Sequence, residues 1–379
     1  MNCPTDCQTE PNRFLPNSAR LCAGLFLWHG INVPLVSSKS TSSPSCIARK
    51  KRHSEVTENV ASSKSQADEK MTYFYAELIK KREQLIPIIL DSGVSTELER
   101  RGAKMRNGQW SGCVAIDDYE KLVETHIAYI EAGADIITVN SYASSRLMLG
   151  PAGLGNEVQQ INRLNISAAI EARQKTRANV SVAGSISHVL PFTDGVEGAK
   201  QQPDISPEEL SDCYSEMISI FENEGVDLIL LEMMSIPARM TPLFQCANKS
   251  SLPIWCGLSA KRETPTAPLT SWHDTSVSFE DIVIQACQYD FDAIGIMHTS
   301  VDAIEPALVA IKSHFSGMLM AYPDSGYFVA PNWQFEDIIK PQVLQEYAKG
   351  WQKSGCSIFG GCCGLGPEHT TALSKLKSA

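Results

Sequence analysis

The feature that most constrains the fold is a regular alternation between short apolar runs and longer amphipathic segments, which begins after Met71. The runs are nearly continuous in apolar residues, as expected of parallel strands that are buried on both faces. Eight such runs span residues 86–91, 134–142, 180–187, 226–233, 252–259, 291–298, 317–324 and 356–362. We therefore expect eight strands in a parallel sheet.

Segments with helical periodicity separate these runs. They span residues 119–132, 157–177, 207–224, 279–288, 301–314 and 341–353, with a shorter one at 237–247. Eight β/α units over roughly 300 residues predict an α/β fold of the (β/α)8 TIM-barrel type. A doubly wound open sheet is the alternative. The turn after the first run, 91–96, lacks the Gly-x-Gly-x-x-Gly pattern of dinucleotide-binding sheets, which favours the barrel.

Composition limits the class of partner. The 379-residue chain has a formal net charge of -10 and a pI near 5.4. Both values argue against nucleic acid or an anionic membrane as the main partner. Its 12 cysteines are spread over a long chain, unlike the disulfide framework of a short secreted domain. We expect reduced thiols and a cytoplasmic location.

The first 70 residues differ from the rest of the chain. They are rich in Ser, Thr, Asn and Pro, and they end in a polar tract at 54–70. An apolar run at 21–28 is too short and too interrupted to span a bilayer. We predict that 1–70 is a low-order extension or targeting segment and that 71–379 is the barrel domain. A transit peptide, which would imply an organelle, and initiation at Met71 remain open.

Polar side chains stand at the carboxyl ends of the predicted strands, where TIM barrels carry their chemistry. They are Asp91, Ser92, Asn140, Ser141, Ser185, Ser187, His188, Glu232, His298, Asp324 and the Cys362-Cys363 pair. An acid such as Glu232, in an otherwise apolar run, needs a partner. The carboxyl end of the barrel is therefore the predicted site.

The Cys362-Cys363 pair is the strongest local signal. It lies between glycine pairs, after an apolar run and before a helix start at Pro367. Glycine lets the backbone turn sharply, so that neighbouring thiols can point to one place. His298 ends the sixth run, and the sixth and eighth strands of a barrel flank the seventh. A Cys₂His set leaves one tetrahedral position for substrate, which is typical of catalytic zinc. The alternatives are an ordinary hydrogen-bonded histidine and two small apolar side chains.

The chain resembles the homocysteine S-methyltransferase family, which includes the betaine-dependent enzyme, over about residues 86–376. The matching segments are 90–93 with 96–102, 132–142, 231–232, 322–326 and, above all, Gly360-Gly361-Cys362-Cys363-Gly364. The resemblance implies a TIM barrel with a zinc ion held by three cysteines. It also implies that the zinc binds the homocysteine thiol as a thiolate, which attacks the methyl group of a sulfonium or betaine donor.

The resemblance also implies roles for particular residues. Cys362 and Cys363 match zinc ligands, Asp91 matches an acid beside the substrate, and Glu232 matches the acid that holds the substrate's amino group. We accordingly predict Asp91 and Glu232 as catalytic residues. The predicted substrate-binding residues are Asp91, Ser92, Ser141 and Glu232. The expected partners are a small thiol and a methyl donor, and a homo-oligomer remains open.

The chain departs from the family at the sixth strand, where Met297-His298 replaces an Asn-Cys pair. We predict a zinc site of His298, Cys362 and Cys363 in place of metal loss, because histidine is among the commonest zinc ligands. Zinc with two thiolates and a neutral imidazole is formally neutral, whereas zinc with three thiolates carries one negative charge. The substrate thiol would ionise more readily but would be a poorer nucleophile.

This difference leaves the reaction partly open. The leading prediction is methyl transfer to a thiol such as homocysteine, giving methionine. The alternatives are methylation or demethylation of a different thiol, selenol or sulfonium metabolite, and a zinc-binding barrel without catalysis. The loop after the third strand also departs from the family, so the donor is undetermined. There His188 is either a proton-handling group at the barrel mouth or an exposed loop histidine. Four aromatic residues either form a cation–π wall or pack the rim: Tyr142, Tyr322, Tyr327 and Trp333.

Overall fold

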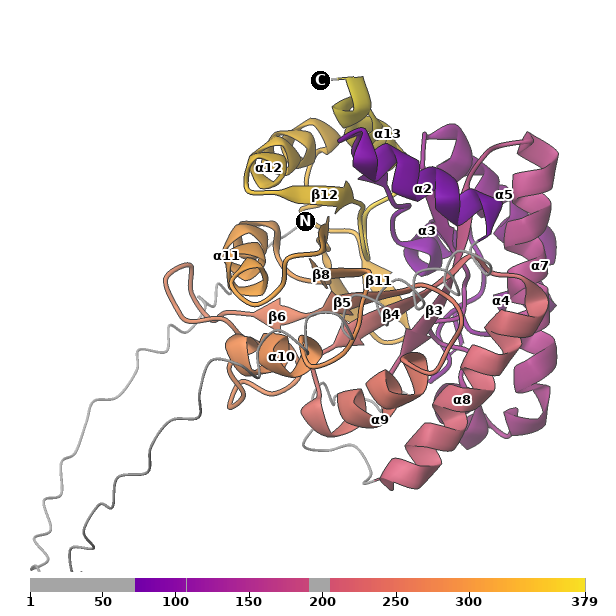
Figure 1. Ribbon diagram of the computed structural model, residues 1–379. Helices are drawn as coiled ribbons and strands as arrows, with labels where there is room; N and C mark the ends of the chain where they lie inside the picture. The colour runs from indigo at the N-terminus through magenta and orange to yellow at the C-terminus, as the bar shows by residue number, and fades with distance from the viewer. Residues whose placement is uncertain (1–71, 107, 191–204, 379) are drawn as a thin grey trace, which may run out of the picture. The chain divides into compact units, whose positions relative to one another are not determined.

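The computed structural model describes residues 72–106, 108–190 and 205–378 (Figure 1). The predictions for residues 1–70 lie outside the described residues. None of the helices in the described part of the chain is long and apolar enough to cross a membrane.

Eight parallel strands form one sheet in the order β1-β12-β9-β8-β5-β4-β3-β2. They are β1 (Ile88–Ile89), β2 (Ile136–Thr138), β3 (Ser181–Ser187), β4 (Leu228–Met234), β5 (Ile254–Leu258), β8 (Ala293–Met297), β9 (Met318–Tyr322) and β12 (Cys356–Phe359). A parallel bridge between Leu90 and Ile136 joins the first strand to the last. The sheet is thus a nearly closed barrel, and the predicted fold class is confirmed.

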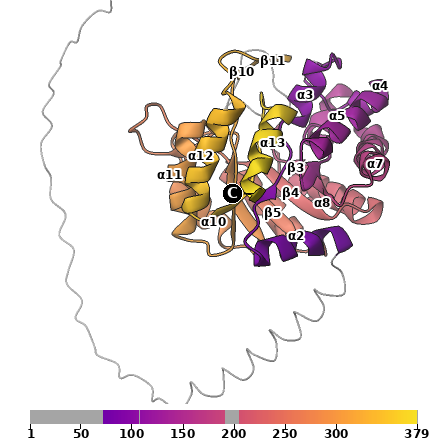
Figure 2. The same cartoon turned by 90° about the horizontal axis from the view of Figure 1, so that it is seen from above.

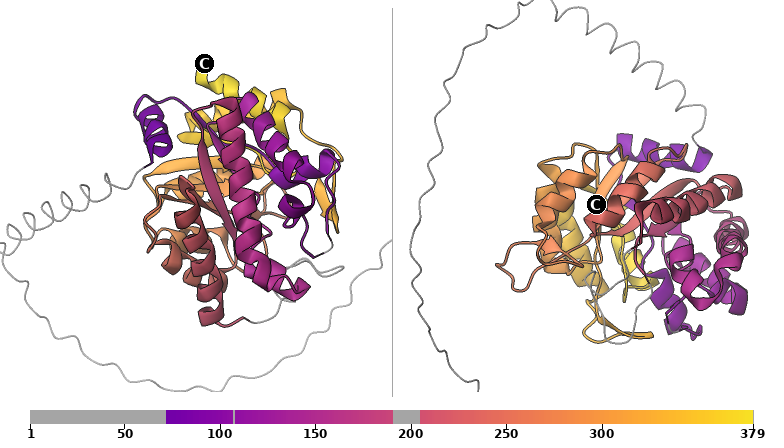
Figure 3. Two further views of the ribbon diagram at one scale, coloured as in Figure 1. Left: turned by 90° about the vertical axis from the view of Figure 1, so that its right-hand side faces the viewer. Right: turned by 90° about the horizontal axis from the view of Figure 1, so that it is seen from below.

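Helices surround the strands, as the views from above, from the side and from below show (Figures 2 and 3). Those that follow strands are α3 (Val94–Arg100), α4 (Val114–Asp117), α5 (Tyr119–Glu131), α6 (Arg146–Leu149), α7 (Val158–Thr176), α8 (Pro207–Glu224), α9 (Pro237–Ala247), α10 (Phe279–Ala286), α11 (Val301–Lys312), α12 (Pro341–Lys353) and α13 (Pro367–Ser374). Short 3-10 turns lie at Gly150–Ala152, Gly155–Glu157 and Lys375–Ser378. The seven predicted helices correspond to α5 and α7–α12.

One further helix, α2 (Tyr73–Glu83), precedes the first strand and was not predicted. The hydroxyl of Thr72 caps it by accepting a hydrogen bond from the Tyr75 N–H at 3.2 Å. Tyr75 and Leu78 join the apolar cluster inside the barrel, and the Trp255 indole donates to the Tyr75 hydroxyl at 3.2 Å. Trp255 lies near the start of β5, so α2 fills the amino end of the barrel and the site is left to the opposite end.

Two antiparallel hairpins extend the loops at the carboxyl end. One pairs β6 (Ala260–Lys261) with β7 (Thr270–Ser271), and the other pairs β10 (Tyr327–Val329) with β11 (Asn332–Gln334). The Glu99 carboxylate, from α3, accepts hydrogen bonds from the Asn332 amide at 2.6 Å and the Trp333 N–H at 3.1 Å. The second hairpin is thereby tied to the loop that follows β1.

Candidate metal centre and substrate pocket

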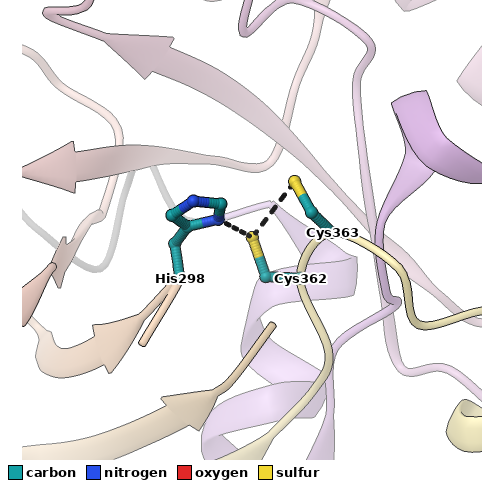
Figure 4. Close-up of side chains that lie close together, drawn as sticks. All are labelled: His298, Cys362 and Cys363. Atoms are coloured by element: carbon teal, nitrogen blue, oxygen red, sulfur yellow. Dashed lines mark hydrogen bonds between the residues drawn. The ribbon is translucent and has the colours of Figure 1, made fainter. Parts of the chain in front are cut away.

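His298, Cys362 and Cys363 lie together at the carboxyl ends of β8 and β12 (Figure 4). The Nδ1 atom of His298 is 3.5 Å from the Cys362 sulfur, and the two sulfurs are 3.9 Å apart. One ligand atom from each of the three side chains lies within 4.8 Å of the others. Two sulfurs and one imidazole nitrogen, 64 positions apart in the chain, therefore face a single point.

Backbone hydrogen bonds fix the cysteine loop against the end of β9. The Cys362 N–H donates to the Pro323 carbonyl at 2.8 Å, and the Ser325 N–H donates to the Cys363 carbonyl at 3.0 Å. Gly364 has a φ of +81°, and a Cβ atom there would lie 1.8 Å from the Ser325 carbonyl oxygen. Only glycine fits this approach, which explains the Gly residue directly after the cysteine pair.

His298 is held in an unusual backbone conformation. Its φ is +42°, in the left-handed region that non-glycine residues seldom adopt. Its N–H donates to the Tyr322 carbonyl at 3.2 Å, and the rings of Trp272 and Trp333 lie 5.1 and 6.0 Å from its ring. Such strain persists only where the surroundings enforce it, and it gathers at ligand sites.

The donor set fits zinc. Tetrahedral zinc with thiolate and imidazole ligands places neighbouring donor atoms about 3.5–3.8 Å apart, as its bond lengths of roughly 2.0–2.3 Å require. The nitrogen–sulfur distance of 3.5 Å lies at the lower end of this range, and the sulfur–sulfur distance of 3.9 Å lies just above it. The pKa of Cys362 lies well above its ordinary value because Cys363 is hydrogen-bonded to it and because it is buried. A bound cation would lower the pKa of Cys362 and so allow both neighbouring thiols to be thiolates.

A cavity of about 360 Å³ opens beside these ligands at the carboxyl ends of the strands. Asp91, at the end of β1, lines it and is 1% exposed. The Thr138 N–H and hydroxyl donate to its carboxylate at 2.6 and 2.7 Å. Burial raises the pKa of Asp91 to about 7, although the bonds from Thr138 oppose that rise.

Glu232, within β4, also lines the cavity and is partly buried. Its carboxylate accepts a short hydrogen bond from the Ser185 hydroxyl. Burial raises the pKa of Glu232 to about 7, while Ser185 and His298 lower it. The cavity, which Asp324 also lines, thus places three carboxylates beside a thiol-rich metal-binding set, and no lysine or arginine is among its described lining residues.

The sequence model of the homocysteine S-methyltransferase family matches residues 88–376. The chain belongs to this family. It is therefore an enzyme of the homocysteine S-methyltransferase type, and family membership implies a small thiol substrate and a methyl donor. The predicted resemblance is confirmed.

Relatives are distant but cover most of the family domain. The chain is similar to homocysteine S-methyltransferase 1 of Zea mays, with 26% identity over 76% of this chain and 93% of that protein. It is 25% identical to the selenocysteine Se-methyltransferase of Brassica oleracea var. italica over 76% and 88% of the two chains. The crystal structure of the metallated homocysteine methyltransferase MmuM from Escherichia coli superposes with a TM-score of 0.62 at 22% identity, over 76% and 95% of the two chains. This structural likeness supports the barrel fold.

Two predicted substrate-binding serines lie in different surroundings in this family member. Ser92 lines the cavity, and its hydroxyl is 3.0 Å from that of Thr370. Ser141 is absent from the described lining. Its hydroxyl donates to the Ser185 carbonyl at 2.8 Å and accepts from the Ser185 N–H at 3.1 Å, so it joins β2 to β3.

His188 is fully buried, so the exposed-loop interpretation is wrong. Its Nε2 atom accepts hydrogen bonds from the Ser235 and Ile236 N–H groups, both at 3.1 Å. Burial lowers the pKa of His188 well below its ordinary value. The ring is therefore neutral and ties the end of β3 to the turn before α9.

Aromatic side chains form much of the cavity wall. The four predicted residues, Tyr142, Tyr322, Tyr327 and Trp333, all line it. Three more were not predicted: Trp110, Trp272 and Phe328. Trp110 comes from the segment before α4, Trp272 directly follows β7 and Phe328 lies in β10, so none of them stands at the end of a barrel strand. Only the general abundance of aromatics in barrel loops could have indicated them.

Proposed function

We propose that this family member is a zinc-dependent methyltransferase. It transfers a methyl group from a sulfonium or betaine donor to a small thiol such as homocysteine, giving methionine. The carrying observation is the convergence of His298, Cys362 and Cys363 on the wall of a cavity that also contains Asp91 and Glu232. Sulfur-binding and ammonium-binding groups thus face one space.

Different residues would bind the thiol and the ammonium group of the substrate amino acid. His298, Cys362 and Cys363 would hold the zinc, which when bound stabilises a thiolate at neutral pH. Asp91 and Glu232 would accept hydrogen bonds from the substrate's ammonium group. The cavity has three carboxylates, including that of Asp324, and no lysine or arginine among its described lining residues, so these groups would stabilise such a cation. When the ammonium binds, the raised pKa values of both acids fall and both become charged.

The cavity also suits a cationic donor. Its volume lies within the range of about 300–1,000 Å³ that is usual for small-molecule sites. Aromatic faces attract a methyl sulfonium or quaternary ammonium by cation–π interaction. In the transfer, the thiolate sulfur forms a bond to the methyl carbon. The carbon–sulfur or carbon–nitrogen bond of the donor breaks with its electron pair on the leaving atom, so the donor loses its positive charge.

One lining donor can serve the substrate's carboxylate. The indole N–H of Trp110 is buried and has no hydrogen-bond partner within the described residues. A buried donor without a partner is costly, at about 1–3 kcal/mol. A carboxylate oxygen of the bound amino acid or donor would satisfy it.

A selenol acceptor is the second candidate. With two thiolates and one imidazole the zinc site is formally neutral, which favours ionisation of the acceptor over its nucleophilicity. A selenol, which is intrinsically more nucleophilic, would suit such a site. The similarity to a protein named selenocysteine Se-methyltransferase supports including this acceptor in any screen.

The test combines metal analysis with a methyl-transfer screen. We expect one zinc per chain in the wild type and loss of most of it in His298→Ala. The variant His314→Ala removes a partly exposed histidine paired with Glu280 on α10 and serves as the control, which should keep its zinc. Wild-type protein without zinc would contradict the proposal, and zinc unchanged in His298→Ala would remove that residue from the ligand set. The screen should give methyl transfer to homocysteine or selenocysteine from at least one sulfonium or betaine donor.

A further inference from the structure

The loop after β1 and the cysteine loop after β12 are joined to each other by main-chain hydrogen bonds. The Gly361 N–H donates to the Asp91 carbonyl at 3.1 Å, and the Gly93 N–H donates to the Leu365 carbonyl at 3.2 Å. A Cβ atom at Gly93 would lie 2.7 Å from the carbonyl oxygen of Cys362. The backbones of the two loops are therefore in direct contact, which the glycine permits.

Thr96, in the first turn of α3, adds a side-chain link at the same junction. Its hydroxyl donates to the Gly93 carbonyl at 3.0 Å and accepts from the Gly364 N–H at 3.1 Å. Thr96 is 1% exposed and lines the cavity. Arg100, one turn further along the same face of α3, donates to the Gly364 carbonyl at 2.9 Å. One helix thus holds both backbone groups of the residue that follows the cysteine pair.

This junction connects the groups that would bind the two ends of the substrate. Asp91, which would bind the ammonium group, stands on the loop after β1. Cys362 and Cys363, which would hold the metal that binds the thiol, stand on the loop linked to it through Thr96. The separation between the two groups is therefore set by main-chain hydrogen bonds and one buried hydroxyl. An acceptor needs the matching number of carbon atoms between its nitrogen and its sulfur or selenium.

The two candidate acceptors differ in this length. Homocysteine has one methylene group more than cysteine, and selenocysteine has the carbon skeleton of cysteine. In a pocket of fixed dimensions, one methylene group changes discrimination by about 10- to 200-fold. A loosely held cysteine loop would adapt to either length and would lose that discrimination.

We propose that Thr96 is a specificity-determining residue that selects the acceptor by the length of its carbon chain. The inference rests on the proposed function, and Thr96 acts by holding the cysteine loop against the loop of Asp91. Thr96→Val keeps the shape of the side chain and removes the hydroxyl. The Gly93 carbonyl then keeps the Glu97 N–H as a donor at 2.9 Å, whereas the buried Gly364 N–H loses its partner. Because a buried donor without a partner is costly, the cysteine loop should shift.

The first experiment titrates the zinc-loaded proteins with homocysteine and with cysteine in a calorimeter. The two dissociation constants should differ about tenfold or more in the wild type, and their ratio should fall at least about fivefold in Thr96→Val, as the loss of one hydrogen bond would cause. Thr96→Ser keeps the hydroxyl and should restore the wild-type ratio. An unchanged ratio in Thr96→Val, or a wild type that binds both thiols equally, would overturn the proposal.

Thr125→Val is the matched control. Thr125 is fully buried in α5, and its hydroxyl donates to the Lys121 carbonyl at 2.9 Å. The variant makes the same chemical change at a buried helix position that is not among the described lining residues of the cavity. It should lower the melting temperature and leave the ratio of dissociation constants unchanged. A purely structural role for Thr96 predicts the same result for both variants, which would contradict the proposal.

Arg100→Leu supplies a second test of the junction. The Arg100 side chain is 33% exposed, so this variant should fold even if Thr96→Val does not. It removes the hydrogen bond to the Gly364 carbonyl and should lower the ratio at least about fivefold. Zinc content separates the two levels of inference. A wild type without zinc would contradict the proposed function, whereas a zinc-loaded wild type with an unchanged ratio in both variants would contradict only the role of Thr96.

Discussion

Asp91 and Glu232 show how single residues can favour binding over stability. Asp91 is fully buried and Glu232 is partly buried, and burial raises the pKa of each carboxyl to about 7. Desolvated acids of this kind cost folding free energy and are retained where a ligand compensates for them. Replacing either acid by a neutral side chain should therefore raise the stability of the fold and lower the activity.

We expect Glu232→Gln to weaken binding of the thiol amino acid by roughly 10- to 100-fold, since a hydrogen bond to a charged group contributes about 1.5–3 kcal/mol. The melting temperature should stay unchanged or rise. Titration calorimetry with homocysteine and thermal unfolding measure the two effects. Glu131→Gln, at an exposed position at the end of α5, is the control for charge. Unchanged homocysteine binding in Glu232→Gln would remove it from the substrate site.

His126 should make the protein sensitive to acid. It is fully buried within α5, neither ring nitrogen has a hydrogen-bond partner among the described residues, and burial lowers its pKa to about 3. In the unfolded chain its pKa is about 6.5. As pH falls below 6.5 the unfolded state takes up a proton that the folded state does not, so stability is lost until about pH 3.

At pH 5 this single residue should cost about 2 kcal/mol relative to pH 7. Urea unfolding at both pH values measures the difference. The variant His126→Leu has a side chain of similar volume and no ionisable group. Between pH 7 and pH 5 it should lose about 2 kcal/mol less stability than the wild type. Equal acid sensitivity in the two proteins would contradict the prediction. His188 and His273, whose pKa values are also lowered by burial, account for a remaining dependence common to both.

At the scale of elements, the β10–β11 hairpin carries part of the cavity wall but belongs to no barrel strand. Its Phe328 and Trp333 rings line the cavity. Its attachment to the loop after β1 depends on Glu99, which accepts from Asn332 and from the Trp333 N–H. The geometry of the wall therefore depends on a residue outside the cavity.

Glu99→Ala should loosen the hairpin and raise the KM for the methyl donor by about fivefold or more, as the loss of one to two hydrogen bonds would cause. Zinc content should not change. Glu305→Ala, which removes an exposed hydrogen bond between α11 and Ser354, outside the hairpin, is the matched control. A donor KM unchanged by Glu99→Ala would show that the hairpin does not need this contact.

Elements buried on both faces were the ones the sequence predicted well. All eight barrel strands were found, although β1 has two residues where the pattern gave six, because only Ile88 and Ile89 form ladder pairs with β12. Helix α2 was missed because Tyr75 and Leu78 are its only buried residues. The two hairpins were missed because strands of two or three residues carry no readable period.

The site was predictable to the extent that it follows strand ends. His298 and Cys362 were singled out because their strands flank a common neighbour, and their atoms lie 3.5 Å apart. The position of a residue at a strand end does not tell in which direction its side chain points. Ser141, for example, points to β3 instead of the cavity. Trp110 and Trp272 come from irregular segments whose path depends on tertiary packing, so no sequence pattern placed them.

At the scale of the whole molecule, every barrel strand and α2 lie after Met71. We propose that residues 71–379 fold as one domain, as the sequence predicted. A chain beginning at Met71 should keep the zinc content and melting temperature of the full chain. A chain beginning at Gln84 should be less stable by at least about 3 kcal/mol, because it loses Tyr75 and Leu78 from the barrel interior. Thermal and urea unfolding of the three chains compare them, and equal stability of the two shorter chains would contradict the role of α2.

The plug that α2 forms at the amino end has a kinetic consequence. Because α2 fills that end in the described part of the chain, we expect both reactants and both products to pass through the mouth at the carboxyl end, past the β10–β11 hairpin. The thiol amino acid would lie between the metal-binding set and the buried Asp91, so we expect it to enter first and its methylated product to leave last. Turnover should therefore follow a compulsory order. In product-inhibition plots the methylated thiol should compete with the substrate thiol, and the demethylated donor should give mixed inhibition against both substrates. Random-order inhibition patterns would mean that a second passage opens during catalysis.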